Sequence, residues 1–223
     1  MKKKSRRNFI KKTSVLGAGF FIVPRNVLGG VGFTPPSDQL NIASIGSGGK
    51  GADIQNSWAS KERVVALCDV DPLGKHGVIQ SRKKYPKANF QLIKNNNFKQ
   101  LKKSYNIVII YGVLHLTSEW KKILKNCKNL FSNVLLFDLR ETNRKTIDNK
   151  ITKSYLSFNH KKNIKIPYNI INSNEVTHFL KKELNSNIYK FSYHGKISNL
   201  AKSKIQNVEF TNYCISKKKL INL

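Results

Sequence analysis

A glycine-rich turn at residues 46–51 constrains the fold of this chain more than any other stretch. It reads G-x-G-x-x-G and follows a short apolar run at residues 40–45. In such a turn Gly46 permits the tight reversal off a strand, Gly48 lets the backbone approach a pyrophosphate, and Gly51 lets the next helix pack on the strand. That helix directs free N–H groups and the positive end of its dipole at the phosphates. The turn therefore predicts a dinucleotide site.

The residues that follow the turn place an acid where such a site needs one. Residues 64–68 form an apolar run typical of a buried parallel strand, and Asp69 comes directly after it. A carboxylate there can accept both hydroxyls of an adenosine ribose. The Asp69 carboxylate favours NAD over NADP because it would repel a 2′-phosphate, and NADP is kept as the alternative. A competing interpretation of Asp69 is an ordinary helix-capping residue. The predicted cofactor-binding residues are Gly46, Ser47, Gly48, Gly49, Gly51 and Asp69.

Strand and helix patterns alternate along the next part of the chain. Residues 106–110 and 133–137 read as buried strands, and residues 117–126 read as a helix with Thr117 as its N-cap. Beyond them, residues 164–168 read as the last strand of the nucleotide domain, residues 175–184 as a helix and residues 187–193 as a strand. The alternation predicts an α/β fold with a doubly wound, Rossmann-type parallel sheet.

The charge balance is strongly basic. The 223 residues include 41 Lys or Arg and 12 Asp or Glu, which gives a formal charge of +29. The basic residues are spread along the chain instead of forming the confined patch expected of a nucleic-acid binder. We therefore expect no specific nucleic-acid partner and keep a basic nucleic-acid-binding protein as a lesser alternative. No cluster of metal-ligand spacing occurs, so no metal is expected.

The N-terminus has the pattern of an export signal. Residues 1–12 are basic and include the pair Arg6 and Arg7, and a short apolar stretch follows at residues 15–23. That stretch is too short to span a bilayer. The pattern predicts a twin-arginine leader, either cleaved or retained as an anchor, and a periplasmic or membrane-tethered protein. The alternative is a cytoplasmic protein whose signal has decayed.

Several segments in order resemble the Gfo/Idh/MocA family (glucose–fructose oxidoreductase/inositol dehydrogenase), in its twin-arginine-exported branch. The matching segments are residues 5–12, 24–30, 36–42, 45–51, 65–71 and 84–88. The likeness is clear over residues 1–110 and faint over residues 110–195. It implies a leader at residues 1–35, an NAD(P)-binding Rossmann domain at residues 36–170 and a truncated remnant of a second α/β domain, the substrate domain, at residues 171–223.

The resemblance also implies an NAD(P)-dependent oxidoreductase that acts on a hydroxyl of a sugar or cyclitol. The family's T-P-x-H-x-H turn beside the nicotinamide aligns with residues 111–117, where only His115 matches. The family's substrate-contacting lysine aligns with Asp138, which would repel a developing alkoxide instead of stabilising it. His115 is thus the one catalytic candidate, although it could equally be a histidine with no catalytic role at the start of a helix. The enzymatic activity of the chain is expected to be impaired.

The expected partners follow from the same resemblance. They are NAD(P), a small polyol or sugar and the twin-arginine translocation machinery, and a homo-oligomer is compatible with them. The alternative function is a non-catalytic dinucleotide-binding module or a gene remnant.

Overall fold

The computed structural model describes residues 34–47, 53, 62–68, 83, 86, 89–90, 104–148, 150–158, 164–197 and 200–220. The chain divides into two compact units, Met1–Gln39 and Leu40–Leu223. All the helices and strands discussed below belong to the second unit. The domain boundaries expected at residues 35 and 170 stay predictions.

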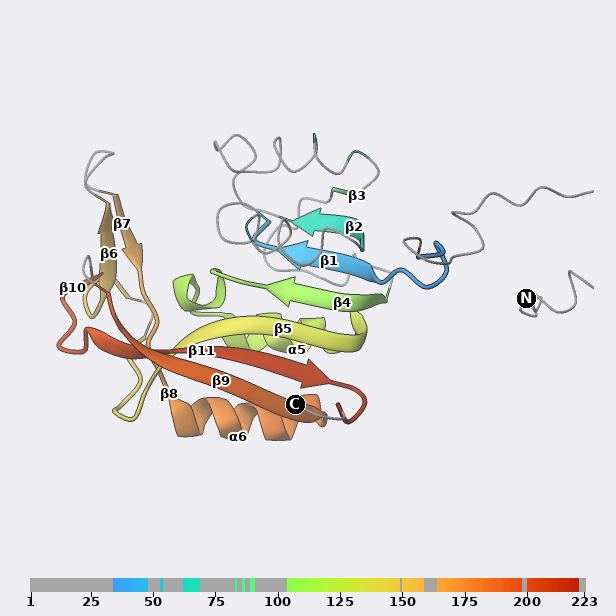
Figure 1. Ribbon diagram of the computed structural model, residues 1–223. Helices are drawn as coiled ribbons and strands as arrows, with labels where there is room; N and C mark the ends of the chain where they lie inside the picture. The colour runs from blue at the N-terminus through green and yellow to red at the C-terminus, as the bar shows by residue number, and fades with distance from the viewer. Residues whose placement is uncertain are drawn as a thin grey trace, which may run out of the picture. The chain divides into compact units, whose positions relative to one another are not determined.

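A mixed sheet forms the centre of the second unit, and eight of its strands lie within the described residues. Their order is β3-β2-β1-β4-β5-β11-β9, with β8 also paired to β5 (Figure 1). The strands are β1 (Asn41–Ile45), β2 (Arg63–Cys68), β3 (Asn89–Phe90), β4 (Tyr105–Ile110), β5 (Phe131–Thr142), β8 (Ile171–Asn172), β9 (Asn187–Lys196) and β11 (Asn207–Ser216). Strands β1 to β5 run parallel, which confirms the predicted α/β class with a Rossmann-like parallel sheet.

The parallel strands are buried on both faces. Along β4, Val108 and Ile110 belong to one hydrophobic cluster, while Ile107 and Ile109 belong to a second cluster on the opposite face. This two-sided burial explains why residues 106–110 are continuously apolar instead of alternating. The sequence pattern was therefore sufficient to place β4.

The sheet beyond β5 is antiparallel, contrary to the predicted parallel sheet. Strand β11 lies between β5 and β9 and runs antiparallel to both, with Tyr213 opposite Phe137 on β5 and Lys190 on β9. The rings of Phe137 and Tyr213 stack with centroids 5.0 Å apart. Residues 207–216 were not anticipated as a strand, so the sequence pattern did not reveal the reversal of direction at this edge.

A second, smaller sheet has the order β10-β6-β7. Its strands are β6 (Tyr155–Phe158), β7 (Ile164–Pro167) and β10 (Leu200–Ala201). The strand expected at residues 164–168 is therefore real, but it pairs with β6 and not with the parallel sheet. A cluster of Tyr168, Ile170, Ile197, Leu200 and Val208 joins this part of the chain to β11. A truncated remnant of a substrate domain stays untested.

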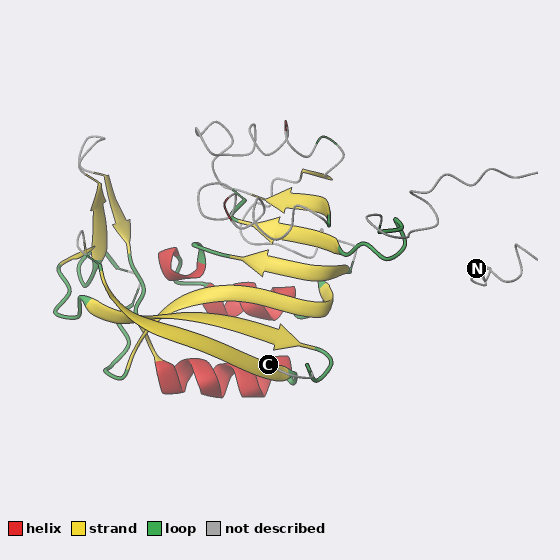
Figure 2. Ribbon diagram, in the orientation of Figure 1, coloured by secondary structure: helices red, strands yellow, loops and turns green. Residues whose placement is uncertain are grey.

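Two helices cover one face of β5 and β11 (Figure 2). Helix α5 (Trp120–Cys127) buries Trp120, Ile123, Leu124 and Cys127, and helix α6 (Ser173–Leu184) buries Val176, Phe179, Leu180 and Leu184. The spacing i, i+3, i+4, i+7 in α5 and i, i+3, i+4, i+8 in α6 is the apolar stripe of a surface helix. Helix α5 starts at Trp120, later than predicted, and the Thr117 hydroxyl accepts the Glu119 N–H. Within the described residues, no helix has the length and apolarity needed to cross a membrane.

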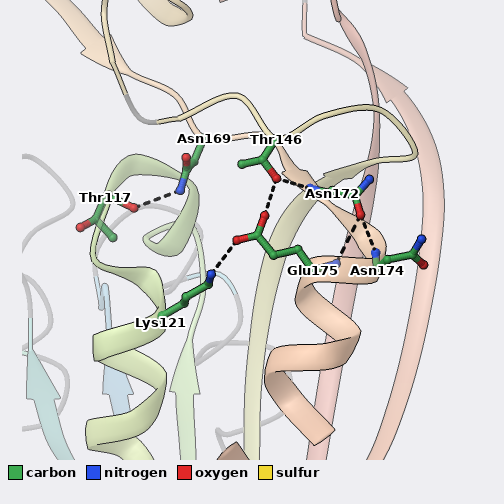
Figure 3. Close-up of polar contacts among 7 residues, drawn as sticks. All are labelled: Thr117, Lys121, Thr146, Asn169, Asn172, Asn174 and Glu175. Atoms are coloured by element: carbon green, nitrogen blue, oxygen red, sulfur yellow. Dashed lines mark hydrogen bonds and ion pairs between the residues drawn. The ribbon is translucent and has the colours of Figure 1, made fainter. Parts of the chain in front are cut away.

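The first turn of α6 is held by polar contacts from three segments (Figure 3). The Asn172 side chain accepts the N–H groups of Asn174 and Glu175 and so caps the helix. The Glu175 carboxylate accepts from Lys121 Nζ on α5 and from the Thr146 hydroxyl, each at 2.6 Å. These contacts fix α6 against α5 and against the loop that follows β5.

A buried carboxyl lies at the end of β5. Glu141 is completely buried, and the Tyr213 hydroxyl donates to its Oε1 at 2.5 Å. Burial raises the pKa of Glu141, although the hydroxyls of Tyr213 and Ser173 and the charge of Lys190 act in the opposite direction and Glu209 adds to the rise. The folded state therefore holds a proton at Glu141 more tightly than the unfolded state does.

We expect Glu141→Gln to stabilise the protein at pH 8. As pH rises from the ordinary glutamate pKa of 4.5 through the raised folded value, the wild type must ionise a buried carboxyl, so its free energy of unfolding falls relative to the variant. The gain should be largest at pH 8 and should shrink toward pH 4.5. Urea unfolding of both proteins across this range measures it. Glu183→Gln, which alters a partly exposed partner of Lys125, should show no such trend; a constant difference for Glu141→Gln would contradict the prediction.

Candidate cofactor-binding site at the carboxyl edge of the sheet

The sheet reverses its order between β1 and β4. Strands β2 and β3 extend from one side of β1, and β4 and β5 extend from the other. In open α/β sheets, ligands bind in the crevice outside the carboxyl ends of the strands at such a switch point. We therefore define the switch point by the residues that leave these two strands: Gly46, Ser47, Tyr111 and Gly112.

Gly46 makes the turn off β1, and only glycine fits there. Its φ is +77°, and a Cβ at this position would lie 2.6 Å from Val113 Cγ2 and 2.9 Å from the Tyr111 carbonyl oxygen. The N–H groups of Gly46 and Ser47 both donate to the Cys68 carbonyl, at 2.8 and 3.1 Å. The turn is thus tied to the end of β2 and packed against the exit of β4.

Gly112 makes the corresponding turn off β4. Its φ is +73°, but apart from its chain neighbours no atom of the described residues lies within 4 Å of a Cβ built there. Its N–H donates to Asp138 Oδ1 on β5 at 2.7 Å. Next to it, burial and the charge of Asp138 raise the pKa of Tyr111 to about 12, so the phenol keeps its proton at neutral pH.

The second oxygen of Asp138 is paired with Arg140. Arg140 Nη1 donates to Asp138 Oδ2 at 2.7 Å, and the two side chains are only 12% and 8% exposed. Arg140 is itself held, since its Nε donates to the Tyr168 hydroxyl at 3.0 Å and its guanidinium lies 4.2 Å from the centre of the Phe210 ring. The carboxylate therefore bridges a fixed cation and the turn that leaves β4.

His115 lies in a short 3-10 helix, η4 (Leu114–Leu116), just after the β4 turn. It is 6% exposed, its ring centre lies 4.9 Å from that of Tyr168, and its carbonyl accepts the Asn169 N–H at 2.7 Å. Its Nδ1 has no hydrogen-bond partner among the described residues. Burial, with the charge of Arg140, lowers the pKa of His115 to about 4, against a smaller opposing effect of Asp138. The imidazole is therefore neutral at pH 7.

The structure brings together four of the residues singled out from the sequence. Gly46 and Ser47 leave β1 against the exit of β4, Asp138 is linked through Arg140 to the Tyr168 hydroxyl, and the His115 ring contacts the ring of Tyr168. The remaining predicted cofactor residues, Gly48, Gly49, Gly51 and Asp69, lie outside the described residues. Their roles, like the role of His115, stay predictions.

Arg140 and Tyr168 were missed by the sequence reasoning. The spacing of Asp138 and Arg140, two positions apart on a strand, puts both on one face and could have signalled the pair. No local signal links Tyr168 to them, because that contact joins residues 28 positions apart. Among the parts of the chain that the structure describes, no group of three His, Cys, Asp or Glu side chains could hold a metal ion.

Comparison with solved structures finds the same fold in S-adenosylmethionine (SAM)-dependent methyltransferases. A SAM-dependent methyltransferase from Methanosarcina mazei aligns with a TM-score of 0.54 and 13% identity over 80% of this chain and 92% of its own. The N-terminal domain of EvdMO1, solved with S-adenosylhomocysteine (SAH) bound, aligns with a TM-score of 0.54 and 12% identity over 96% of this chain and 98% of its own. The CurJ carbon methyltransferase aligns with a TM-score of 0.50 and 14% identity over 82% of this chain, which spans half the length of that protein.

Two other comparisons gave no relative. No protein-family model matches the chain, and no curated protein matches it either. The identities to the solved structures are at most 14% in these three cases, so the likeness establishes the fold alone.

These findings correct the expectation drawn from the Gfo/Idh/MocA resemblance. The solved structures reported above are two methyltransferases and a domain with S-adenosylhomocysteine bound, and they overturn the predicted NAD(P) cofactor, the oxidoreductase activity and the sugar or cyclitol substrate. The physical reason is that a glycine turn and an acid after the second strand recognise adenosine, which NAD and SAM both carry. The antiparallel β11 also departs from the all-parallel order of a dinucleotide fold.

The other expected partners and functions receive no support. The comparisons favour neither a non-catalytic dinucleotide module nor a nucleic-acid-binding protein. The twin-arginine machinery is likewise unsupported as a partner, and residues 1–33, which carry that motif, lie outside the described residues. The predicted export of the chain is not tested.

We expect Gly46→Ala to destabilise the protein more than Gly112→Ala. Both substitutions place alanine at positive φ, at a cost of roughly 1–2 kcal/mol. Only the Gly46 variant also forces a Cβ against the Tyr111 carbonyl and the Val113 side chain, which should add about 1 kcal/mol or more. Thermal and urea unfolding of the two variants measure the difference. Equal losses would show that the two strand exits are not packed as described.

We expect the His115→Phe variant to lose less free energy of unfolding in acid than the wild type does. Because the pKa of His115 is about 4 when folded and 6.5 when unfolded, the unfolded state binds the extra proton between these values. The wild type should therefore lose on the order of 3 kcal/mol from this group as pH falls from 6.5 to 4. Phenylalanine keeps a ring against Tyr168 and does not titrate. Urea unfolding as a function of pH tests this, with the exposed His178→Gln as a control that should follow the wild type.

Proposed function

We propose that this chain binds S-adenosylmethionine at the switch point and transfers its methyl group to an acceptor. The observation that carries the proposal is the alignment of almost the whole chain, 96%, with 98% of a domain solved with S-adenosylhomocysteine bound. The other alignments reported above are also to methyltransferases. The acceptor is left open by this argument.

The described turns at the switch point lack the cations that would pair with a pyrophosphate. The chain contains 41 Lys or Arg, yet neither residue type occurs in Gly46–Ser47 or among residues 111–117, the described parts of the two turns. His115 is neutral, and the charge directly bonded to the β4 turn is the carboxylate of Asp138. Because Arg140 pairs with this carboxylate, the described turns have little net charge, and a pyrophosphate would lack a cationic partner in them.

The shape of the turns also fits a bound adenosine cofactor. The missing side chain of Gly46 leaves the β1 and β4 exits in direct backbone contact, and the free space at Gly112 lets a ligand approach the β4 turn. Asp69, which follows β2 in the sequence, is the residue proposed to accept the ribose hydroxyls. The described residues are thus compatible with the cofactor.

The described side chains near the proposed cofactor site have defined protonation states at neutral pH. When bound, S-adenosylmethionine supplies a methyl group on a positively charged sulfur. His115 is neutral at pH 7, and its buried Nδ1 has no hydrogen-bond partner among the described residues, so this nitrogen is free to accept a hydrogen bond. Tyr111 and Tyr168 keep their protons, because burial raises the pKa of each to about 12.

The direct test is the binding of S-adenosylhomocysteine to the purified full-length chain by isothermal titration calorimetry. We expect saturable binding that NAD does not displace. Both molecules would occupy the same switch point, and its described turns hold no Lys or Arg to pair with the pyrophosphate of NAD. Gly46→Val should abolish binding, since its side chain would fill the contact between the two strand exits. Glu119→Gln, on the exposed Lys122 pair, should bind as the wild type does. Binding of NAD in preference to S-adenosylhomocysteine, or binding of neither, would refute the proposal.

A further inference from the structure

The pair of Asp138 and Arg140 is an unusual feature to find beside the switch point. Both side chains are almost fully buried, at 8% and 12% exposure. Removing two charges from water costs about as much as their attraction returns, so a buried ion pair is a poor source of stability. A geometric role explains its presence better than a stabilising one.

The geometry of the pair shows what that role is. A carboxylate has two oxygens, and each is committed here: Oδ2 to Arg140 Nη1 and Oδ1 to the Gly112 N–H, both at 2.7 Å. The Gly112 bond is the contact that joins β5 to the turn leaving β4. Gly112 has a positive φ and no side chain of its own to pack, so at this position the turn is held by its backbone hydrogen bond, while its neighbours Tyr111 and Val113 pack on the hydrophobic clusters.

Arg140 fixes the direction in which Asp138 points. The guanidinium is held by the Tyr168 hydroxyl at 3.0 Å, by the Leu139 carbonyl at 3.2 Å and by the face of the Phe210 ring. The Phe210 ring in turn stacks on Tyr193 with centroids 5.1 Å apart. With Arg140 anchored on these sides, Oδ2 is pinned and Oδ1 is left facing Gly112.

We propose that Asp138 is a positioning residue for the cofactor crevice, holding the β4 exit turn through the Gly112 N–H while Arg140 keeps its carboxylate oriented. This inference rests on the proposed function, because it identifies the turn as one wall of the S-adenosylmethionine site. Asp138 does not touch the cofactor in this proposal. It acts on the cofactor through Gly112.

The first test measures the turn itself, without any ligand. Amide hydrogen exchange of Gly112, followed by NMR, should become about tenfold faster or more in Asp138→Ala, because a hydrogen bond to a charged group is lost. Asp138→Asn should show a similar loss. Asparagine has one oxygen, and the charged Arg140 competes with the Gly112 N–H for it. Asp148→Asn, in an exposed pair with Lys153, should leave the exchange unchanged.

The decisive variant is the double substitution Asp138→Asn with Arg140→Met. Removing the competing donor frees the asparagine oxygen for Gly112, so protection should return to within about threefold of the wild type. A buried ion pair with a purely stabilising role would show no such rescue. The affinity for S-adenosylhomocysteine should follow the same order: about tenfold weaker in Asp138→Ala and Asp138→Asn, and largely restored in the double variant.

Each outcome has a separate meaning. Unchanged Gly112 exchange in Asp138→Ala, or no rescue in the double variant, would overturn the positioning role. Faster exchange with unchanged affinity would show that the turn is not a wall of the cofactor site and would also overturn the inference. If the wild type binds no S-adenosylhomocysteine, the proposed function fails, and the Gly112 exchange still decides whether Asp138 holds the turn.

Discussion

The pairing of β11 with β5 and β9 is the constraint on which the second half of this structure depends. Strand β11 is an interior strand of the sheet, with ten paired positions with β9 and eight with β5. Its inward side chains, such as Tyr213 and Ile215, complete the cluster under α5 and α6. Without β11, β5 would be an edge strand and the core beneath it would be open to water.

The same pairing positions the polar side chains at the carboxyl edge of the sheet. Phe210 lies opposite Arg140 on β5 and opposite Tyr193 on β9, so the guanidinium, the Phe210 ring and the Tyr193 ring form a row across three strands. Arg140 then orients Asp138, and Asp138 holds the turn at Gly112. The polar network at the candidate site is thus organised from the late strands of the chain, although the turns that it supports come from the early ones.

The described switch-point turns differ in charge from the rest of this strongly basic chain. The formal charge of +29 is spread over the molecule, whereas the described switch-point turns contain no Lys or Arg and adjoin a carboxylate. The substitution of Asp for an expected lysine at position 138, taken from the sequence as a sign of impaired hydride transfer, has a direct structural use as the acceptor for Gly112.

The local patterns of the sequence were sufficient for the parallel half of the fold. Residues 63–68 and 106–110 were placed as strands because two-sided burial makes them continuously apolar, and Gly46 was placed at a turn because its spacing demands a residue without a side chain. The candidate site was predicted only in part. Gly46, Ser47, His115 and Asp138 carry local signals, while Arg140 and Tyr168 act through contacts that no short pattern contains.

The sequence by itself determined that a turn beginning at Gly46 would leave a strand of a parallel sheet, since strand period, apolar runs and glycine are properties of neighbouring residues. Only the tertiary structure decided that residues 207–216 return between β5 and β9 and that the fold is the one shared by methyltransferases. Strand direction and order are set by pairings between distant segments, such as Tyr213 with Phe137, and those pairings leave no mark on the local pattern of either strand.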